Sequence, residues 1–156
     1  MAGRRDQIKL SDEEVSAFLE EQRVVVCATN GVKGWPHLMP LWYVVRSGEL
    51  WAWTFAKSQK VKNLERDPRA TLLVETGFEY AELRGVQIEA EAELIRDPDQ
   101  VFEFAKELTV RYAEGIESVE GDPATALRAQ APKRATIHFR PVRVATWDHR
   151  KLGGTY

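Results

Sequence analysis

The sequence predicts a mainly β (α+β) fold, in which an antiparallel barrel or sandwich of six strands is surrounded by a few helices. Six segments rich in β-branched and aromatic residues have the length of strands, and short turns join most of them. One of these segments, residues 86–94, alternates strictly between apolar and polar residues. Because helical patterns occur at only two or three places, hairpins must provide most of the connections.

The composition predicts a single globular domain over residues 1–156. The net charge of −2 gives no overall field that would attract nucleic acid, and no apolar run approaches the roughly 18 residues of a membrane span. The single cysteine, Cys27, excludes a disulfide within the chain and a cysteine metal cage, and its apolar neighbours predict a buried thiol. We therefore expect a cytoplasmic protein that binds neither nucleic acid nor membranes.

The first half of the chain contains two predicted helices. Residues 1–22 form an N-terminal segment whose helix begins at Ser11, because Ser11 and Glu14 make a capping box. A second helix is predicted where a strand ends at Ser58. The strands predicted in this half are 23–30, 36–45, 50–55 and 70–75. The prolines at 36 and 40 cannot donate a backbone hydrogen bond, so part of the second strand should face an edge or an opening.

The second half predicts two strands, 86–94 and 134–147, with the last one interrupted at Pro141. Between them, residues 97–115 predict a helix with a proline near its start and a glycine past its end. Residues 117–133 are predicted to form a mobile loop with about one helical turn. Residues 148–156 are expected to be a flexible tail.

A lysine-rich turn at the start of the second helix predicts an anion site. If Ser58 caps this helix, the amides of the first turn, which include those of Gln59 and Lys60, point at one place. Cations at a helix N-terminus oppose the helix dipole unless an anion lies between them, and Lys57 and Lys60 can both reach this place. We therefore interpret the turn as a phosphate clamp, although a solvated basic helix face is the alternative. For Lys62, which points elsewhere, the solvated face is favoured.

Four of the five tryptophans, Trp35, Trp42, Trp51 and Trp53, lie in two adjacent predicted strands. Aromatic side chains can form the walls of a site for a planar heterocycle. Strand edges that contain proline leave some backbone groups outside the sheet's hydrogen-bond ladder, and these groups can contact the rim of the heterocycle. The alternative interpretation of the tryptophans is that they form an aromatic core and part of a dimer interface. The lysine-rich turn next to these strands favours a ligand site.

No catalytic side chain can be assigned from the sequence. The three histidines lack the spacing of a metal site, and no nucleophile triad, Walker loop or dinucleotide-binding motif is present. We expect no bound metal. The remaining interpretation is a protein whose chemistry belongs to a bound cofactor.

The C-terminal segment "TWDHRKLGGTY" places Trp147 before Arg150 and Lys151, and glycines follow. It is interpreted either as a disordered basic terminus or as a tail that folds over an anionic ligand, across a dimer.

Two segments carry a resemblance to a known family. "TFAKSQKVKNLERDPRATLLVE" and "FRPVRVATWDHRKL" resemble the flavin and deazaflavin split-barrel superfamily, the pyridoxamine 5′-phosphate oxidase-like fold. The resemblance extends from Val24 to Leu152. It implies a six-stranded antiparallel split β-barrel of the FMN-binding type with peripheral helices, which forms a homodimer with its cofactor site at the interface.

The resemblance also implies a set of cofactor-binding residues. The strand 38–43 would lie along the ring, Trp53 and Thr54 would border the ring and its side arm, and Trp147 would come from the partner subunit. The implied residues are Leu38, Met39, Pro40, Leu41, Trp42, Tyr43, Trp53, Thr54, Lys57, Ser58, Gln59, Lys60, Trp147, Arg150 and Lys151. The oxidases of the family carry an arginine where Gln59 stands and end in a different segment, so oxidation of pyridoxamine phosphate is not expected.

The same segments are most similar to the B group of actinobacterial flavin/deazaflavin oxidoreductases, which implies coenzyme F-420 as the cofactor. Its tail of glutamates needs cations, which Lys57, Lys62, Arg150 and Lys151 could supply. The implied reaction is hydride transfer from the reduced deazaflavin to an unsaturated or quinone-like small molecule, with His37, Tyr43 or His149 as candidate proton donors. The alternatives are an FMN-dependent oxidoreductase of the same fold and a non-catalytic protein that binds flavin, deazaflavin or haem.

Overall fold

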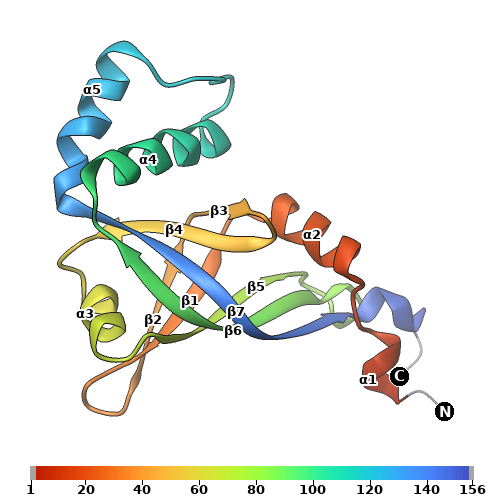
Figure 1. The fold of residues 1–156 in the computed structure, drawn as a ribbon. Coiled ribbons are helices and arrows are strands. Elements are labelled where there is room, and N and C mark those ends of the chain that lie inside the picture. Colours follow the sequence, from red (N-terminus) through yellow and green to blue (C-terminus); the bar gives the residue numbers. More distant parts are fainter. Residues whose placement is uncertain (1–2, 155–156) are drawn as a thin grey trace.

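A curled antiparallel sheet of seven strands forms the body of the molecule in the computed structural model, which describes residues 3–154 (Figure 1). The strands lie in the order β2-β1-β5-β6-β7-β4-β3. Their bounds are β1 Val25–Asn30, β2 Pro36–Leu41, β3 Tyr43–Arg46, β4 Glu49–Phe55, β5 Arg69–Thr76, β6 Arg84–Ile95 and β7 Arg134–Asp148. The helices are α1 Arg4–Gln7, α2 Asp12–Glu21, α3 Gln59–Arg66, α4 Pro98–Tyr112 and α5 Gly121–Gln130, and short 3-10 helices are η1 Tyr80–Glu82, η2 Ala131–Lys133 and η3 His149–Leu152.

The prediction of six strands is wrong, because the predicted strand 36–45 is divided at Trp42. Its first part, β2, pairs with β1 at one edge of the sheet, and its second part, β3, pairs with β4 at the other edge. The chain therefore crosses between the two edges of a curled sheet at Trp42. At this crossing the backbone N–H of Tyr43 donates to the hydroxyl of Tyr112 at 2.9 Å, so it has a partner outside the strand ladder.

Two other predictions in the second half of the chain are wrong. Residues 117–133 contain the helix α5 and η2, which pack on α4 through a small apolar cluster with Val101 and Phe102. The strand β7 is not interrupted at Pro141. The ladder between β6 and β7 skips Val142, which forms a bulge. The bulge accommodates Pro141, which has no backbone N–H to donate to the ladder.

The described part of the expected tail, from Asp148 to Gly154, is not an extended segment. It begins with η3, and the buried carboxylate of Asp148 accepts the backbone N–H of Arg150 at 3.0 Å. Residues 155 and 156 lie outside the described residues.

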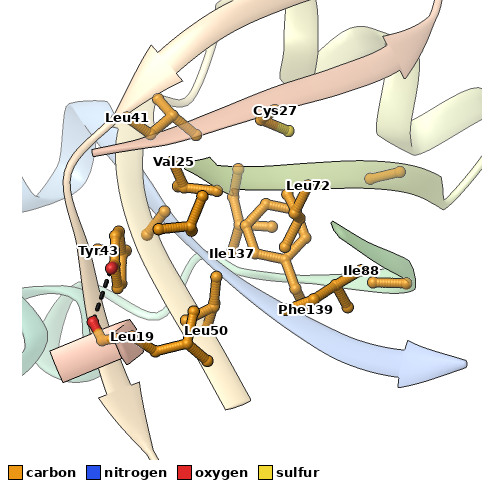
Figure 2. Packing of buried hydrophobic residues seen from close by; sticks show 14 of the residues in the cluster. Leu19, Val25, Cys27, Leu41, Tyr43, Leu50, Leu72, Ile88, Ile137 and Phe139 are labelled. Carbon is orange, nitrogen blue, oxygen red and sulfur yellow. Dashed lines mark hydrogen bonds between the residues drawn. The ribbon is translucent and has the colours of Figure 1, made fainter. Parts of the chain in front are cut away.

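The core lies inside the curl of the sheet (Figure 2). The alternation predicted for 86–94 is confirmed, since Val86, Ile88 and Ala90 are buried against the inner residues of the neighbouring strands. The helix α2 closes one end of the core, and the predicted capping box of Ser11 and Glu14 is present. The hydroxyl of Tyr43 lies 2.7 Å from the carbonyl of Leu19 and 3.0 Å from that of Gln22, which fixes α2 to the crossing strand.

The helices α4 and α3 cover different parts of the sheet. The helix α4 packs on the outer face of β3 and β4, where Phe104 and Leu108 contact Val44. The helix α3 lies at the opposite end of the sheet from α1 and the C-terminal residues (Figure 1). Among residues 3–154, no helix is long and apolar enough to cross a membrane.

Replacing Asn63 with alanine should lower the free energy of unfolding by about 1–3 kcal/mol, the cost of a lost buried hydrogen-bond partner. The Asn63 side chain is fully buried and donates from Nδ2 to Thr29 Oγ1 at 3.0 Å, so it fixes α3 to β1. Urea denaturation measures the change. Lys62→Ala, at an exposed position of the same helix, is the control and should change stability by less than about 0.5 kcal/mol. Equal stability of the two variants would contradict this account of how α3 is held.

Candidate functional site

The curled sheet is open between β2 and the last part of β4. The strand β3 pairs with β4 from Glu49 to Ala52, so within residues 3–154 Trp53, Thr54 and Phe55 have β7 on one side and no strand on the other. In the same part of the chain, β2 pairs only with β1. We call the opening between β2 and residues 53–55 the split. Backbone groups along both of its edges are free to bind a ligand, because no strand ladder uses them.

An apolar cavity of about 460 Å³ lies at the split. It is lined by Val24, Pro40, Leu41, Trp42, Trp53 and Leu108. The ring of Trp42 stacks on that of Tyr112 at 4.5 Å, which holds it in place as a wall. Flat aromatic walls and free backbone groups fit the binding of a planar heterocycle. Thus four of the residues predicted to lie along the ring, those at 40, 41, 42 and 53, line one cavity.

Not all of the predicted ring residues take part through their side chains. Leu38 and Met39 are exposed on β2 beside the split. The side chain of Tyr43 instead points into the core, where its hydroxyl is held by Leu19 and Gln22. Burial raises the pKa of the Tyr43 hydroxyl well above its usual range, so the structure does not favour Tyr43 as a proton donor. The ring of His37 is half-buried, and among residues 3–154 its Nδ1 has no hydrogen-bond partner.

The N-terminus of α3 has unused donors at the split. Ser58 has the extended backbone of a cap residue, with φ −68° and ψ 158°, but its side chain makes no capping hydrogen bond. Ser58 thus has the predicted cap position before α3, but its hydroxyl does not cap the helix. The Ser58 Oγ atom is buried, and within the described residues it has no partner. The amides of the first turn also lack acceptors inside the helix.

Lys60 differs from the predicted geometry. Its side chain is only 7% exposed, and its ammonium group donates to Thr54 Oγ1 at 3.0 Å. It thus lies inside the end of the barrel next to Thr54, and not beside the exposed Lys57. Burial lowers the pKa of Lys60. Within residues 3–154 no carboxylate lies at ion-pair distance from it, and the only other titratable group that affects it is the buried thiol of Cys27.

The remaining residues of the lysine-rich turn are exposed. Gln59 donates from Nε2 to Asn63 Oδ1 at 2.9 Å, so its amide supports α3. Lys57 and Lys62 both point to solvent. The turn therefore offers one buried cation, Lys60, together with the uncapped amides, and two further cations, Lys57 and Lys62, at its surface.

The C-terminal residues predicted for the site lie elsewhere in the chain. Trp147 packs directly on its cross-strand partner Gly85, where an added Cβ would lie 2.1 Å from the indole. Arg150 is bonded to Asp148 at 2.6 Å, and Lys151 to Glu14 at 2.6 Å. These residues are at the far end of the sheet from α3 (Figure 1). One chain thus does not bring them to the split.

Several residues that shape the split cannot be identified from local patterns in the sequence. Leu108 and Tyr112 belong to the apolar stripe of α4, and such a stripe does not reveal which part of the sheet it covers. Arg134, which lies 4.5 Å from the ring of Trp53, is separated from it by 81 residues along the chain.

Comparison with known proteins relates the chain to one family. The family model described as pyridoxamine 5′-phosphate oxidase matches residues 11–148. A comparison with curated protein sequences finds no match.

Solved structures with a similar fold include a conserved hypothetical protein, Rv2991, from Mycobacterium tuberculosis. It is 36% identical, with a TM-score of 0.86, over 99% of this chain and 95% of that one. An F420 reductase is 21% identical, with a TM-score of 0.65, over 83% and 94%. The haem storage protein HutZ from Vibrio cholerae is 14% identical, with a TM-score of 0.65, over 86% and 93%. The last two show a shared fold.

Replacing Lys60 with methionine should raise the free energy of unfolding at neutral pH by about 0.5–2 kcal/mol, as is common when a functional site is relieved of a destabilising group. The reason is that Lys60 is a buried charge without a carboxylate partner among the described residues. Lys62→Met, on the exposed face, is the control and should have a much smaller effect.

The gain in stability should depend on pH. Because burial lowers the pKa of Lys60, the unfolded chain keeps this proton at pH values where the folded chain has lost it. The wild type should therefore become more stable relative to Lys60→Met as the pH rises through the lowered pKa. Urea denaturation at several pH values measures the difference, and a gain that grows with pH would contradict the burial of a charged ammonium group.

Proposed function

The chain belongs to the pyridoxamine 5′-phosphate oxidase family, and on this basis we propose that it is an oxidoreductase that uses the deazaflavin coenzyme F-420. Its reaction would transfer a hydride from the reduced cofactor to an unsaturated or quinone-like small molecule. The fold is one that binds flavins, and the family includes oxidoreductases.

The observation that carries the proposal is the buried ammonium group of Lys60. A buried charge without a counter-ion costs several kcal/mol unless something compensates it. Thr54 supplies a single neutral acceptor, and the structure gives Lys60 no carboxylate within the described residues. The unbonded hydroxyl of Ser58 and the free amides of α3 are donors in the same turn. A phosphate at this place would satisfy all of these groups together.

The cavity beside the turn suits the ring of the cofactor. Trp42 and Trp53 would hold a planar ring between aromatic walls, and the free backbone edges of β2 and β4 would contact its polar rim. When bound, the deazaflavin supplies the hydride. The residues of this chain would orient the ring, with Leu108 and Val24 against its apolar side.

Coenzyme F-420 is preferred to FMN because of the sequence resemblance around the lysine-rich turn. An F420 reductase with the same fold is consistent with this preference, although at 21% identity it supports only the fold. FMN carries the same type of phosphate and is the first alternative. Haem without catalysis is the second, since a haem storage protein shares the fold.

A homodimer with the cofactor at its interface is part of the proposal. The outer face of β1, β2, β5 and β6 has a hollow of about 460 Å³ lined in part by Ala28, Pro36 and Val142. Leu38, the cross-strand partner of Ala28, is 56% exposed beside it. A second copy on this face would cover the apolar residues and could bring its Trp147 to the split.

Wild-type protein should bind coenzyme F-420 more tightly than FMN or haem, as measured by quenching of tryptophan fluorescence in separate titrations. Lys60→Met should weaken the binding of F-420 by about 1–3 kcal/mol, the range for a charge-assisted hydrogen bond. Lys33→Met, in the exposed turn between β1 and β2, serves as the matched control and should bind normally. Tight binding of FMN without binding of F-420 would replace the proposed cofactor. Binding without oxidation of the reduced cofactor by any of a panel of enones and quinones would favour a carrier protein.

Leu38→Glu should convert the dimer to a monomer in sedimentation experiments, because it places a charge where the second copy would cover the exposed Leu38 side chain. Lys33→Glu, in the exposed turn between β1 and β2, is the control for added negative charge. A wild-type protein that is monomeric at all concentrations would rule out the proposed interface.

A further inference from the structure

The chain before α2 and the end of β7 enclose a hollow away from the split. The strand β7 pairs with β4 through its first part, so within residues 3–154 its residues 140–148 have β6 on one side and no strand on the other. The N-terminal chain follows this free edge for a short distance, since the N–H of Asp148 donates to the carbonyl of Ile8 at 2.7 Å and that of Leu10 donates to Thr146 Oγ1 at 3.0 Å. A hollow of about 610 Å³ lies between the two segments. Because α1 and the end of β7 lie at the far end of the sheet from α3 (Figure 1), we call it the terminal hollow.

The floor of the terminal hollow is apolar. Val144 belongs to the inner face of β7, because it lies opposite Ile88 in the ladder and cross-strand partners share a face. Ile88 is 3% exposed, as a core residue should be, whereas Val144 is 47% exposed. Leu10 and Val15 pack against the core from the N-terminal side and also line the hollow. The hollow is thus a part of the core that the chain leaves uncovered, and covering its floor would be favourable.

The rim of the terminal hollow carries more positive than negative charge. It includes the cations Arg5, Lys9 and Arg143 and a single acid, Asp12. Lys9 and Arg143 each pair with one carboxylate outside the hollow, at 2.8 and 3.2 Å. Both pairs are largely exposed to solvent, and exposed ion pairs contribute little to stability. These cations can therefore turn to another anion at small cost.

We propose that the terminal hollow binds a small amphiphile that has an apolar chain and one carboxylate. The apolar chain would cover Val144, Leu10 and Val15 and remove their surface from water. The carboxylate would accept hydrogen bonds from the cations of the rim, where a guanidinium can hold both of its oxygens. Since three cations face one acid, the rim selects an anionic head over a neutral or cationic one. The site is independent of the proposed function, because no residue that lines the cavity at the split also lines this hollow.

Three probes with the same chain length test the head group. Octanoate, octanamide and octylammonium are titrated by calorimetry below the concentrations at which they aggregate. Wild-type protein should bind octanoate about tenfold more tightly than octanamide, and octylammonium most weakly. Lys9→Gln and Arg143→Gln should each reduce this preference about threefold, as expected for an exposed ion pair. Arg140→Gln is the matched control, because Arg140 is also an exposed arginine of β7 that pairs with a glutamate of β6 but does not line the hollow.

Val144→Gln tests the apolar floor. This variant should bind octanoate and octanamide alike at least about fivefold more weakly, because the lost apolar contact does not depend on the head group. Val32→Gln, at an exposed position in the turn between β1 and β2, is the control and should bind both probes as the wild type does. Urea denaturation checks that both variants are folded. Their affinity for coenzyme F-420 should equal that of the wild type, since the split lies elsewhere.

The outcomes separate this site from the other parts of the molecule. If wild-type protein binds octanoate no more tightly than octanamide, or binds neither, the proposal is overturned. Displacement of octanoate by F-420, together with normal binding by Val144→Gln, would place the probe in the cavity at the split and would also overturn it. If Val144→Gln changes the sedimentation of the protein but not its affinity for octanoate, a second copy covers the hollow and the proposal fails.

The proposed function is tested separately. The titrations with octanoate use protein without added cofactor, so a failure of F-420 to bind would contradict the proposed function alone. The preference for octanoate and its loss in Arg143→Gln would still decide whether the terminal hollow is a carboxylate site.

Discussion

The chain is continuous at Trp42, where it passes from one edge of the sheet to the other, and this continuity prevents the sheet from closing. Because the same segment supplies one edge strand to each end of the sheet, the two edges are tied at one point and diverge beyond it. The sheet therefore cannot close by pairing β2 with the last part of β4. Tyr112 makes this crossing stable, since its hydroxyl contacts both the N–H and the carbonyl of Tyr43, and its ring supports that of Trp42.

At the split, polar side chains are buried at positions where apolar core residues would otherwise lie. Thr54 and Lys60 are buried at its inner side, and Ser58 has a buried hydroxyl without a partner among the described residues. Such groups lower stability in the folded protein, and natural sequences retain them where a ligand completes their interactions. Val61 and Leu64 are buried under the same helix, so apolar contacts hold α3 together with the hydrogen bond from Asn63 to Thr29.

The alternation of side chains along β4 gives the site two different sides. On the inner side, the hydroxyl of Thr54 and the ammonium of Lys60 form a small polar pair suited to a compact anion. On the outer side, Trp53 and Phe55 present flat surfaces, and Arg134 lies against both. A long ligand with a planar ring and more than one anionic group could contact both sides at once, because a single strand separates them.

Elements with local signals could be predicted from the amino-acid sequence. The capping box at Ser11, the alternation of 86–94 and the turn at the start of α3 all depend on residues within a few positions of one another. Three features could be seen only in the folded chain: the division of the predicted strand at Trp42, the inward direction of Lys60 toward Thr54, and the contact of Arg134 with Trp53. These features depend on the curvature of the sheet and on pairing between strands that are distant in the sequence. Neither can be inferred from residues that are close together along the chain.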